Sequence, residues 1–346
     1  MNIYITLDYE LYLGRKTGTP ENCLFRPMSA IMDMLDKTGI KLTVFVDGAY
    51  LYRMSELKDN CQSINKDLHN VTMNIKEISE RGHSVQYHFH PQWLYSTYEE
   101  EKGWVMDMNH YKLSDVPGDK LSIAFRKGKE IIEKIIGKKI IAFRAGGYSL
   151  CSYLCYGSLF NNNGIRIDSS VLPGLWERSK FQEYDYRKAP LKSSYNFRED
   201  VCTELMDEKD AFVEIPITTI PGKINICYWI NYTFHKFQKE QQSISEPVVV
   251  YGDGKSVSTE ISRIVKYWKI FKALFRNGIT MANLDSLKGS IYDAYTRVSQ
   301  SNQNQLVIIG HPKASSNLSI KELERFIDEK LIVGDNFLTF DNVLNY

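Results

Sequence analysis

Residues 74–90 read NIKEISERGHSVQYHFH, and this stretch contains the pattern on which the fold prediction rests. Its first half places apolar residues at helical spacing, Gly82 interrupts it, and an extended run follows. A glycine at such a point is typical of a helix that ends on a left-handed residue, because glycine has no Cβ to clash there. The stretch therefore predicts a helix, a cap and a strand in direct succession.

The same succession occurs four more times along the chain. The stretches are AIMDMLDKTGIKLTVFVD (30–47), GKEIIEKIIGKKIIAFRA (128–145), YGSLFNNNGIRIDSSV (156–171) and WKIFKALFRNGITMANLD (268–285). Three further extended runs cover residues 2–8, 211–218 and 305–312. Strands that alternate with helices in this way predict an α/β barrel with parallel strands. A doubly wound sheet is the alternative, but no GxGxxG motif follows the first strand.

We expect residues 1–346 to form a single barrel domain. Segment 218–257 has no clear periodicity, and it is predicted to be an insertion near the mouth of the barrel. Residues 258–277 carry apolar side chains at helical spacing, which predicts a helix that faces the core.

The composition excludes several classes of protein. With 346 residues, 43% of them hydrophobic and 25% charged, the chain is typical of a globular protein. The 43 basic and 42 acidic residues leave a net charge of +1, so a nucleic acid or an anionic membrane surface is not an expected partner. No apolar run is long enough to span a membrane, and the first residues, MNIYITLDYELYLG, lack a signal-peptide pattern. Together with six sparse cysteines, this predicts a cytoplasmic protein with reduced thiols.

Residues with chemically useful side chains end many of the predicted strands. In a barrel the carboxyl ends of the strands meet at one mouth, where catalytic groups are found. Because residues i and i+2 of a strand share a face, His88 and His90 point the same way, and His83 points away from them. Two imidazoles and one carboxylate form the ligand set of a catalytic zinc-type site. The full set at the strand ends is Asp8, Glu10, His88, His90, Arg144, Asp168 and His311.

Five motifs in one order resemble the polysaccharide deacetylases of carbohydrate esterase family 4, whose fold is a distorted seven-stranded α/β barrel. They are TLDYE (6–10), GHSVQYHFHPQW (82–93), FRAGGY (143–148), GIRIDSSVLPG (164–174) and VIIGHP (307–312). Two motifs depart from the family pattern. The usual adjacent Asp-Asp is here Asp8-Tyr9-Glu10, and the usual two histidines four apart are here His88 and His90, with Gln92 at the place of the second.

The resemblance implies a metal-dependent deacetylase and a role for each residue. Glu10, His88 and His90 would bind a divalent metal, expected to be zinc. Asp8 would be the catalytic base, held by Arg144, and His311 the general acid. Asp168 would hold the other ring nitrogen of His311, and the backbone amide of Tyr148 would bind the oxyanion. Trp93 and Trp176 follow predicted strands, and we expect their aromatic faces to stack on sugar rings.

The substrate predicted from this resemblance is an N-acetylated carbohydrate, such as an intermediate of cell-surface polysaccharide synthesis. Two other classes stay open from the sequence. The first is a catalytically silent sugar-binding barrel, because two motifs depart from the pattern. The second is a metal-dependent phosphoesterase, which is weakened by the shortage of Lys and Arg near the site, where only Arg144 is evident.

Overall fold

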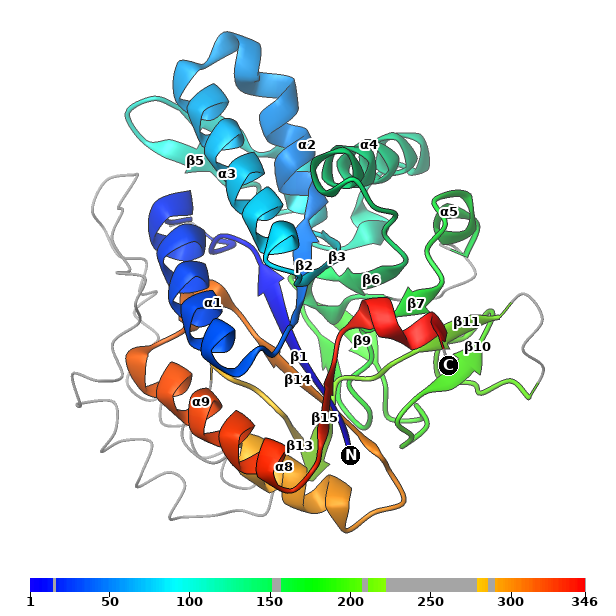
Figure 1. Ribbon diagram of the computed structural model, residues 1–346. Coiled ribbons are helices and arrows are strands. Elements are labelled where there is room, and N and C mark those ends of the chain that lie inside the picture. Colours follow the sequence, from blue (N-terminus) through cyan, green and yellow to red (C-terminus); the bar gives the residue numbers. More distant parts are fainter. Residues whose placement is uncertain (15–16, 151–156, 207–210, 222–278, 286–289, 346) are drawn as a thin grey trace, which may run out of the picture.

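The computed structural model describes residues 1–14, 17–150, 157–206, 211–221, 279–285 and 290–345. Its centre is a curled sheet of mainly parallel strands with helices on its outer side (Figure 1). The main strands are β1 (Asn2–Tyr9), β2 (Thr43–Asp47), β3 (Ser84–Phe89), β6 (Ala142–Ala145), β7 (Ile167–Asp168), β11 (Phe212–Glu214) and β14 (Gln305–Gly310). Seven α-helices are described: α1 (Arg26–Thr38), α2 (Gly48–Leu57), α3 (Gln62–Glu80), α4 (Gly118–Ile136), α5 (Gly157–Asn162), α8 (Ser290–Ser299) and α9 (Asn317–Ile332).

The order of the strands separates a barrel from a doubly wound sheet. The strands lie in the order β11, β7, β6, β3, β2, β1, β14, and each neighbouring pair is parallel. Strands that follow one another in the chain are thus neighbours, and the last strand returns to the first. A doubly wound sheet instead reverses direction at a switch point. The predicted fold class, a distorted barrel of the deacetylase type, is confirmed.

The curl is closed irregularly by the chain that follows β11. The amide of Thr218 donates to the carbonyl of Val307 on β14 at 3.1 Å, and Ile309 donates to Ala282 at 2.9 Å. The predicted strand at 279–285 is therefore divided. Its first part, β13 (Ile279–Met281), pairs antiparallel with β12 (Thr219–Pro221), and Asn283 then bridges Ile309 in parallel.

Shorter elements complete the sheet and its rims. Strand β10 (Tyr195–Phe197) extends the sheet antiparallel to β11, and β15 (Asn336–Leu338) pairs with β1. Two hairpins, β4 (Thr97–Glu99) with β5 (Gly103–Val105) and β8 (Trp176–Arg178) with β9 (Glu183–Asp185), lie outside it. No helix among these described parts is both long and apolar enough to cross a membrane.

The glycines that were predicted to end helices do so wherever the structure describes them. Gly39, Gly82, Gly137 and Gly164 have φ angles of 72°, 86°, 68° and 69°, in the left-handed region that favours glycine. Gly39 and Gly137 are the caps of α1 and α4. The fifth glycine, Gly278, lies outside the described residues, as do the helix predicted at 258–277 and most of the insertion predicted at 218–257.

Two buried carboxyl groups lie side by side where β7 and β11 pair. Asp168 and Glu214 are opposite one another in the register, and both are fully buried. Burial raises the pKa of both groups, and the neighbouring Asp168 raises that of Glu214 further. Oε2 of Glu214 is buried and has no hydrogen-bond partner among the described residues. A proton shared between the two carboxyl groups would account for both observations, and we expect the pair to hold one in the native state.

This shared proton makes stability depend on pH. Since the native pKa of Glu214 is raised, the native state binds more protons than the unfolded chain above pH 4.5, the ordinary value of this group. Stability is therefore lost as the pH rises toward the native pKa, by about 1.4 kcal/mol per unit of difference. In Glu214→Gln an amide replaces the protonated carboxyl group. We expect the difference in melting temperature, variant minus wild type, to increase as the pH rises from 4.5 to 7.5. A constant difference over this range, in thermal unfolding, would contradict the shared proton.

Candidate active site

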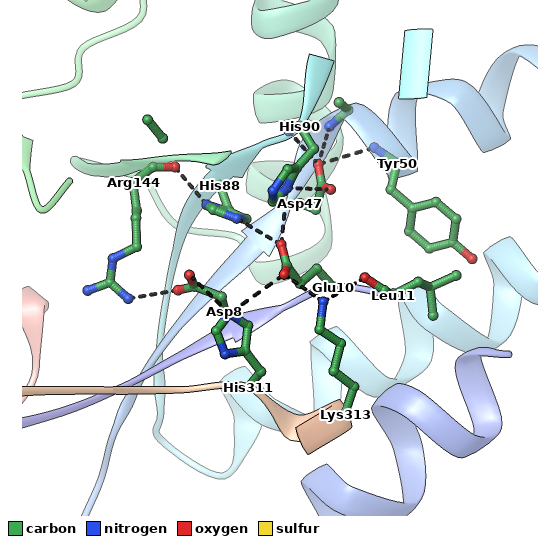
Figure 2. Close-up of polar contacts among 12 residues, drawn as sticks. Asp8, Glu10, Leu11, Asp47, Tyr50, His88, His90, Arg144, His311 and Lys313 are labelled. Atoms are coloured by element: carbon green, nitrogen blue, oxygen red, sulfur yellow. Dashed lines mark hydrogen bonds and ion pairs between the residues drawn. The ribbon is translucent and has the colours of Figure 1, made fainter. Parts of the chain in front are cut away.

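Two carboxylates at the end of β1 lie at the centre of the candidate site. Asp8 and Glu10 alternate along the strand, so they face the same side, and their exposed fractions are 2% and 5%. Oδ1 of Asp8 accepts a hydrogen bond from Nη1 of Arg144 at 2.7 Å (Figure 2). Burial raises the pKa of Asp8, but Arg144, His88 and His311 together outweigh burial and hold it below its ordinary value. Asp8 is therefore a carboxylate that stays ionised.

Arg144 is fully buried, and its guanidinium group is fixed on all sides. Nε donates to the carbonyl of Ser169 at 2.9 Å, and Nη2 to the hydroxyl of the same residue at 3.0 Å. Nη1 also donates to the hydroxyl of Thr6 at 3.0 Å, and the group lies 4.1 Å from the centre of the Phe45 ring. A guanidinium group held this firmly sets the position of Asp8.

Three side chains converge as the predicted metal ligands. Nε2 of His88 and Nδ1 of His90 each lie 3.0 Å from Oε2 of Glu10, and the three donor atoms lie within 4.8 Å of one another. The outer nitrogen of His88, Nδ1, is 2.7 Å from the carbonyl of Arg144. If that nitrogen donates its proton to the carbonyl, Nε2 presents a lone pair to the carboxylate. In that tautomer two lone pairs would face each other at 3.0 Å, and either a proton or a bound cation between them would relieve the repulsion.

The electrostatics of the cluster also favour a bound cation. Burial lowers the pKa of His88, but Asp8 and Glu10 outweigh burial and raise this pKa to about 9. Nδ1 of His90 is buried and makes no hydrogen bond to the described residues, although Oδ2 of Asp47 is also only 3.3 Å away. A divalent cation bound by one carboxylate and two imidazoles would satisfy both observations. The residues present thus fit the metal that the resemblance implies.

The close approach of His90 depends on Gly146. A Cβ at this glycine would lie 2.6 Å from Cδ2 of His90 and 2.6 Å from the carbonyl of Phe89. Gln92, at the place of the family's second histidine, is fully buried, and both of its amide atoms are without a hydrogen-bond partner among the described residues. Among the described residues, the second imidazole beside Glu10 is therefore that of His90, and Gln92 is not a member of this group.

His311 faces both carboxylates from the other side. Its Nε2 lies 3.6 Å from Oε1 of Glu10 and 3.9 Å from Oδ2 of Asp8. Its Nδ1 bonds to Oδ2 of Asp285, and its backbone amide donates to Oδ1 of the same residue at 2.8 Å. Burial lowers the pKa of His311, but Asp285 raises it above its ordinary value, with smaller contributions from Glu10 and Asp8.

The prediction that Asp168 holds the second nitrogen of His311 is wrong, because Asp285 lies there. Asp168 accepts instead from the hydroxyl of Ser170 at 2.7 Å, and that hydroxyl in turn accepts from the amide of Ala145 at 2.8 Å. Asp168 therefore supports the strand that carries Arg144 and makes no contact with the imidazole. Both aspartates end an extended run, so the position of an aspartate at a strand end predicts the residue type but not which strand supplies it.

Trp93 is also placed differently from the prediction. It is fully buried, packs against Tyr50 and Trp104, and donates from Nε1 to Oδ2 of Asp47 at 2.8 Å. It has no exposed face on which a sugar could stack. Trp176 has an exposed fraction of 44% at the start of β8, and its role in stacking on a sugar stays a prediction.

Tyr148 follows two glycines at the end of β6 and has a φ of 58°, unusual for a residue with a side chain. Its carbonyl accepts a hydrogen bond from the hydroxyl of Tyr186 at 2.7 Å. Gly147 before it also has a positive φ of 58°. Two successive residues of this turn thus have left-handed backbone conformations. Such sparsely populated conformations are often found at functional sites.

Three residues of the site were not among the predicted ones. Asp47 ends β2 and caps α2, and its Oδ1 also accepts from the amide of His90 at 3.2 Å. Asp47 and Asp285 both end extended runs, so the strand-end rule could have found them. Lys313 donates to Oε1 of Glu10 at 2.7 Å. No sequence signal marked it, because most lysines are solvated.

Comparisons with solved structures found distant similarities. A peptidoglycan N-acetylglucosamine deacetylase is 12% identical, with a TM-score of 0.42, over 98% of this chain and 86% of the other. A family 4 acetyl xylan esterase from Clostridium thermocellum is 10% identical, with a TM-score of 0.38, over 100% and 91%. A carbohydrate esterase family 4 pseudoenzyme from Bacillus anthracis is 10% identical, with a TM-score of 0.39, over 99% and 64%. Similarities this distant carry no argument about activity.

Among curated proteins, none matches this sequence. The family model described as polysaccharide deacetylase matches residues 25–154, which include His88, His90 and Arg144. The motif that contains Asp8 and Glu10 precedes this range, and the one that contains His311 follows it, both in the family's order. By this match, residues 25–154 of the chain are similar to the polysaccharide deacetylase family.

Proposed function

We propose that this protein is a metal-dependent hydrolase that removes an N-acetyl group from a sugar or a polysaccharide precursor. The observation that carries the proposal is the arrangement of the two buried carboxylates. Asp8 is paired with Arg144, Glu10 with two imidazoles, and His311 faces both. The groups that we propose as base, metal ligands and acid thus lie around one small space.

Each group has a task in amide hydrolysis. Asp8 is ionised and held by Arg144, so it can accept the proton of the attacking water. His311 directs Nε2 into the site because Asp285 holds its other nitrogen, so it can protonate the departing amine. We propose the backbone amide of Tyr148 as an oxyanion donor. A divalent cation, which we propose to be zinc, would activate water and polarise the acetyl carbonyl when bound to Glu10, His88 and His90.

The substrate is proposed from the family and the surroundings of the site. An N-acetylated carbohydrate is the substrate class of the deacetylase family, and Trp176 is the exposed aromatic residue proposed to stack on it. We place the reaction in the cytoplasm, on a precursor of cell-surface polysaccharide. The free thiols of Cys23, Cys61 and Cys202 support a reducing compartment.

The two alternative functions gain no specific support. A phosphoesterase needs cations that are available to phosphate, but Arg144 is engaged by Asp8 and Lys313 by Glu10. A silent sugar-binding barrel would be expected to have lost the metal ligands, whereas the three predicted donors converge. Metal content separates the silent barrel from the two enzymes. Release of acetate from N-acetylated sugars and nucleotide sugars, compared with release of phosphate, separates the deacetylase from the phosphoesterase.

The metal ligands can be tested one at a time. His88→Ala and His90→Ala should each lower metal occupancy, because removal of even an outer-shell partner typically costs about 10- to 100-fold in affinity. The matched control is His83→Ala, since Nδ1 of His83 accepts from the amide of Leu42 at 3.3 Å, away from the site. Elemental analysis of the purified variants gives the occupancy. Full occupancy in His90→Ala would assign the third ligand position to another residue, with Gln92 the first to examine.

The role of Asp8 can be separated from that of Glu10. Asp8→Asn should keep the metal and lower the rate of acetate release by about 10²- to 10⁴-fold, the usual contribution of a general base. Metal content and activity are measured on the same preparation. Loss of the metal in Asp8→Asn would mean that Asp8 is itself a ligand.

A general acid is recognised by its dependence on the leaving group. His311→Ala should lower the hydrolysis of an N-acetyl sugar by about 10²- to 10⁴-fold and spare more of the activity toward an activated aryl acetate, whose leaving group needs no proton. Asp285→Asn should change the ratio of the two rates in the same direction, and Asp168→Asn, the matched control, should leave the ratio unchanged. Equal losses on both substrates in His311→Ala, with metal and fold intact, would argue against proton donation.

A further inference from the structure

The two oxygens of Glu10 have different partners. Oε2 faces His88 and His90, each at 3.0 Å. Oε1 accepts from Nζ of Lys313 at 2.7 Å. Figure 2 shows the two imidazoles on one side of the carboxylate and the lysine on the opposite side. One oxygen is thus directed to the metal site, and the other is held by an ammonium group.

Lys313 is held as firmly as the carboxylate it contacts. It lies in the short helical turn η8 (Pro312–Ala314) that follows β14, and only 11% of its side chain is exposed. Nζ also donates to the carbonyl of Leu11 at 2.8 Å and lies 5.3 Å from the centre of the Tyr12 ring. The hydroxyl of Tyr12 donates to the carbonyl of Lys313 at 2.8 Å. Since a lysine is seldom buried unless it is paired, this placement indicates a specific role.

We propose that Lys313 is a positioning residue that occupies Oε1 and so limits Glu10 to one oxygen as a metal ligand. This inference rests on the proposed metal site. A carboxylate that binds through both oxygens suits cations with many oxygen ligands, and one that binds through a single oxygen suits a tetrahedral site. With two imidazoles and one oxygen, the centre favours Zn²⁺ over Mn²⁺, which prefers carboxylate and water ligands. Lys313 thus contributes to the choice of metal.

Metal affinity alone would not test this role. Removing the ammonium group takes away a positive charge that repels the cation, which strengthens binding. It also releases the carboxylate from its fixed orientation, which weakens binding. The two effects oppose each other, so the readout must report the number of ligands. Cobalt serves this purpose, because tetrahedral Co²⁺ absorbs visible light much more strongly than Co²⁺ with five or six ligands.

The experiment compares Co²⁺ spectra of the metal-depleted full chain and of Lys313→Met. The wild type should show the strong absorbance of a tetrahedral centre, and in the variant it should fall several-fold at saturating Co²⁺. Competition titrations should show the preference for Zn²⁺ over Mn²⁺ reduced by roughly tenfold. Lys129→Met is the matched control, since Lys129 is also a buried lysine paired with a glutamate, Glu133, but on α4. Its spectrum should equal that of the wild type.

A second variant covers the case in which Lys313→Met fails to fold. Lys313→Ala leaves space for ethylammonium, which can donate to Oε1, and its addition should restore the strong absorbance. An unchanged spectrum in Lys313→Met, or a weakly absorbing wild type, would overturn the role of Lys313 and leave the deacetylase proposal intact. If the wild type binds no Co²⁺ and releases no acetate, the proposed function itself fails, and the inference falls with it.

Discussion

The buried pair between Arg144 and Asp8 is the interaction on which the rest of the site depends. It joins β6 to β1 across the interior of the barrel, and the same guanidinium group reaches Ser169, beyond β7. Four of its five N–H groups donate to a carboxylate, two hydroxyls and a carbonyl, and its face packs on Phe45. Removing one partner of such a pair typically costs on the order of 3–5 kcal/mol, because the other charge stays buried and unpaired. The pair therefore couples the fold to the ionisation of the proposed base.

The other charged groups of the site are also each paired with a group of opposite charge. Glu10 is balanced by Lys313 on one oxygen and by the proposed cation site on the other, and His311 is balanced by Asp285. Burial disfavours each charged form, yet the paired groups bring the pKa of Glu10 well below and that of His311 above their ordinary values. Burial thus shields these groups from bulk water, which strengthens the electrostatic interactions among them.

Much of the fold and part of the site could be predicted from local pattern. Glycine is needed wherever a helix ends in a left-handed residue, so Gly39, Gly82, Gly137 and Gly164 marked real boundaries. Strand alternation selected Asp8 with Glu10 and His88 with His90, because neighbours at i and i+2 share a face whatever surrounds them. The same rule could not say which strand end lies beside which. For this reason the rule predicts Asp168 where Asp285 lies, and it does not distinguish the buried Trp93 from an exposed aromatic residue.

The sequence by itself determined the alternation of helices and strands, the positions of the turns and the residue types that end each strand, since these depend on interactions between near neighbours. Only the tertiary structure decided which of these ends meet. Sequential strand order and closure near Thr218 bring His311 and Asp285 to Asp8, some three hundred residues away in the chain. The burial of Lys313 was likewise decided there, because a lysine loses its usual water only when distant segments enclose it and supply a carboxylate in exchange.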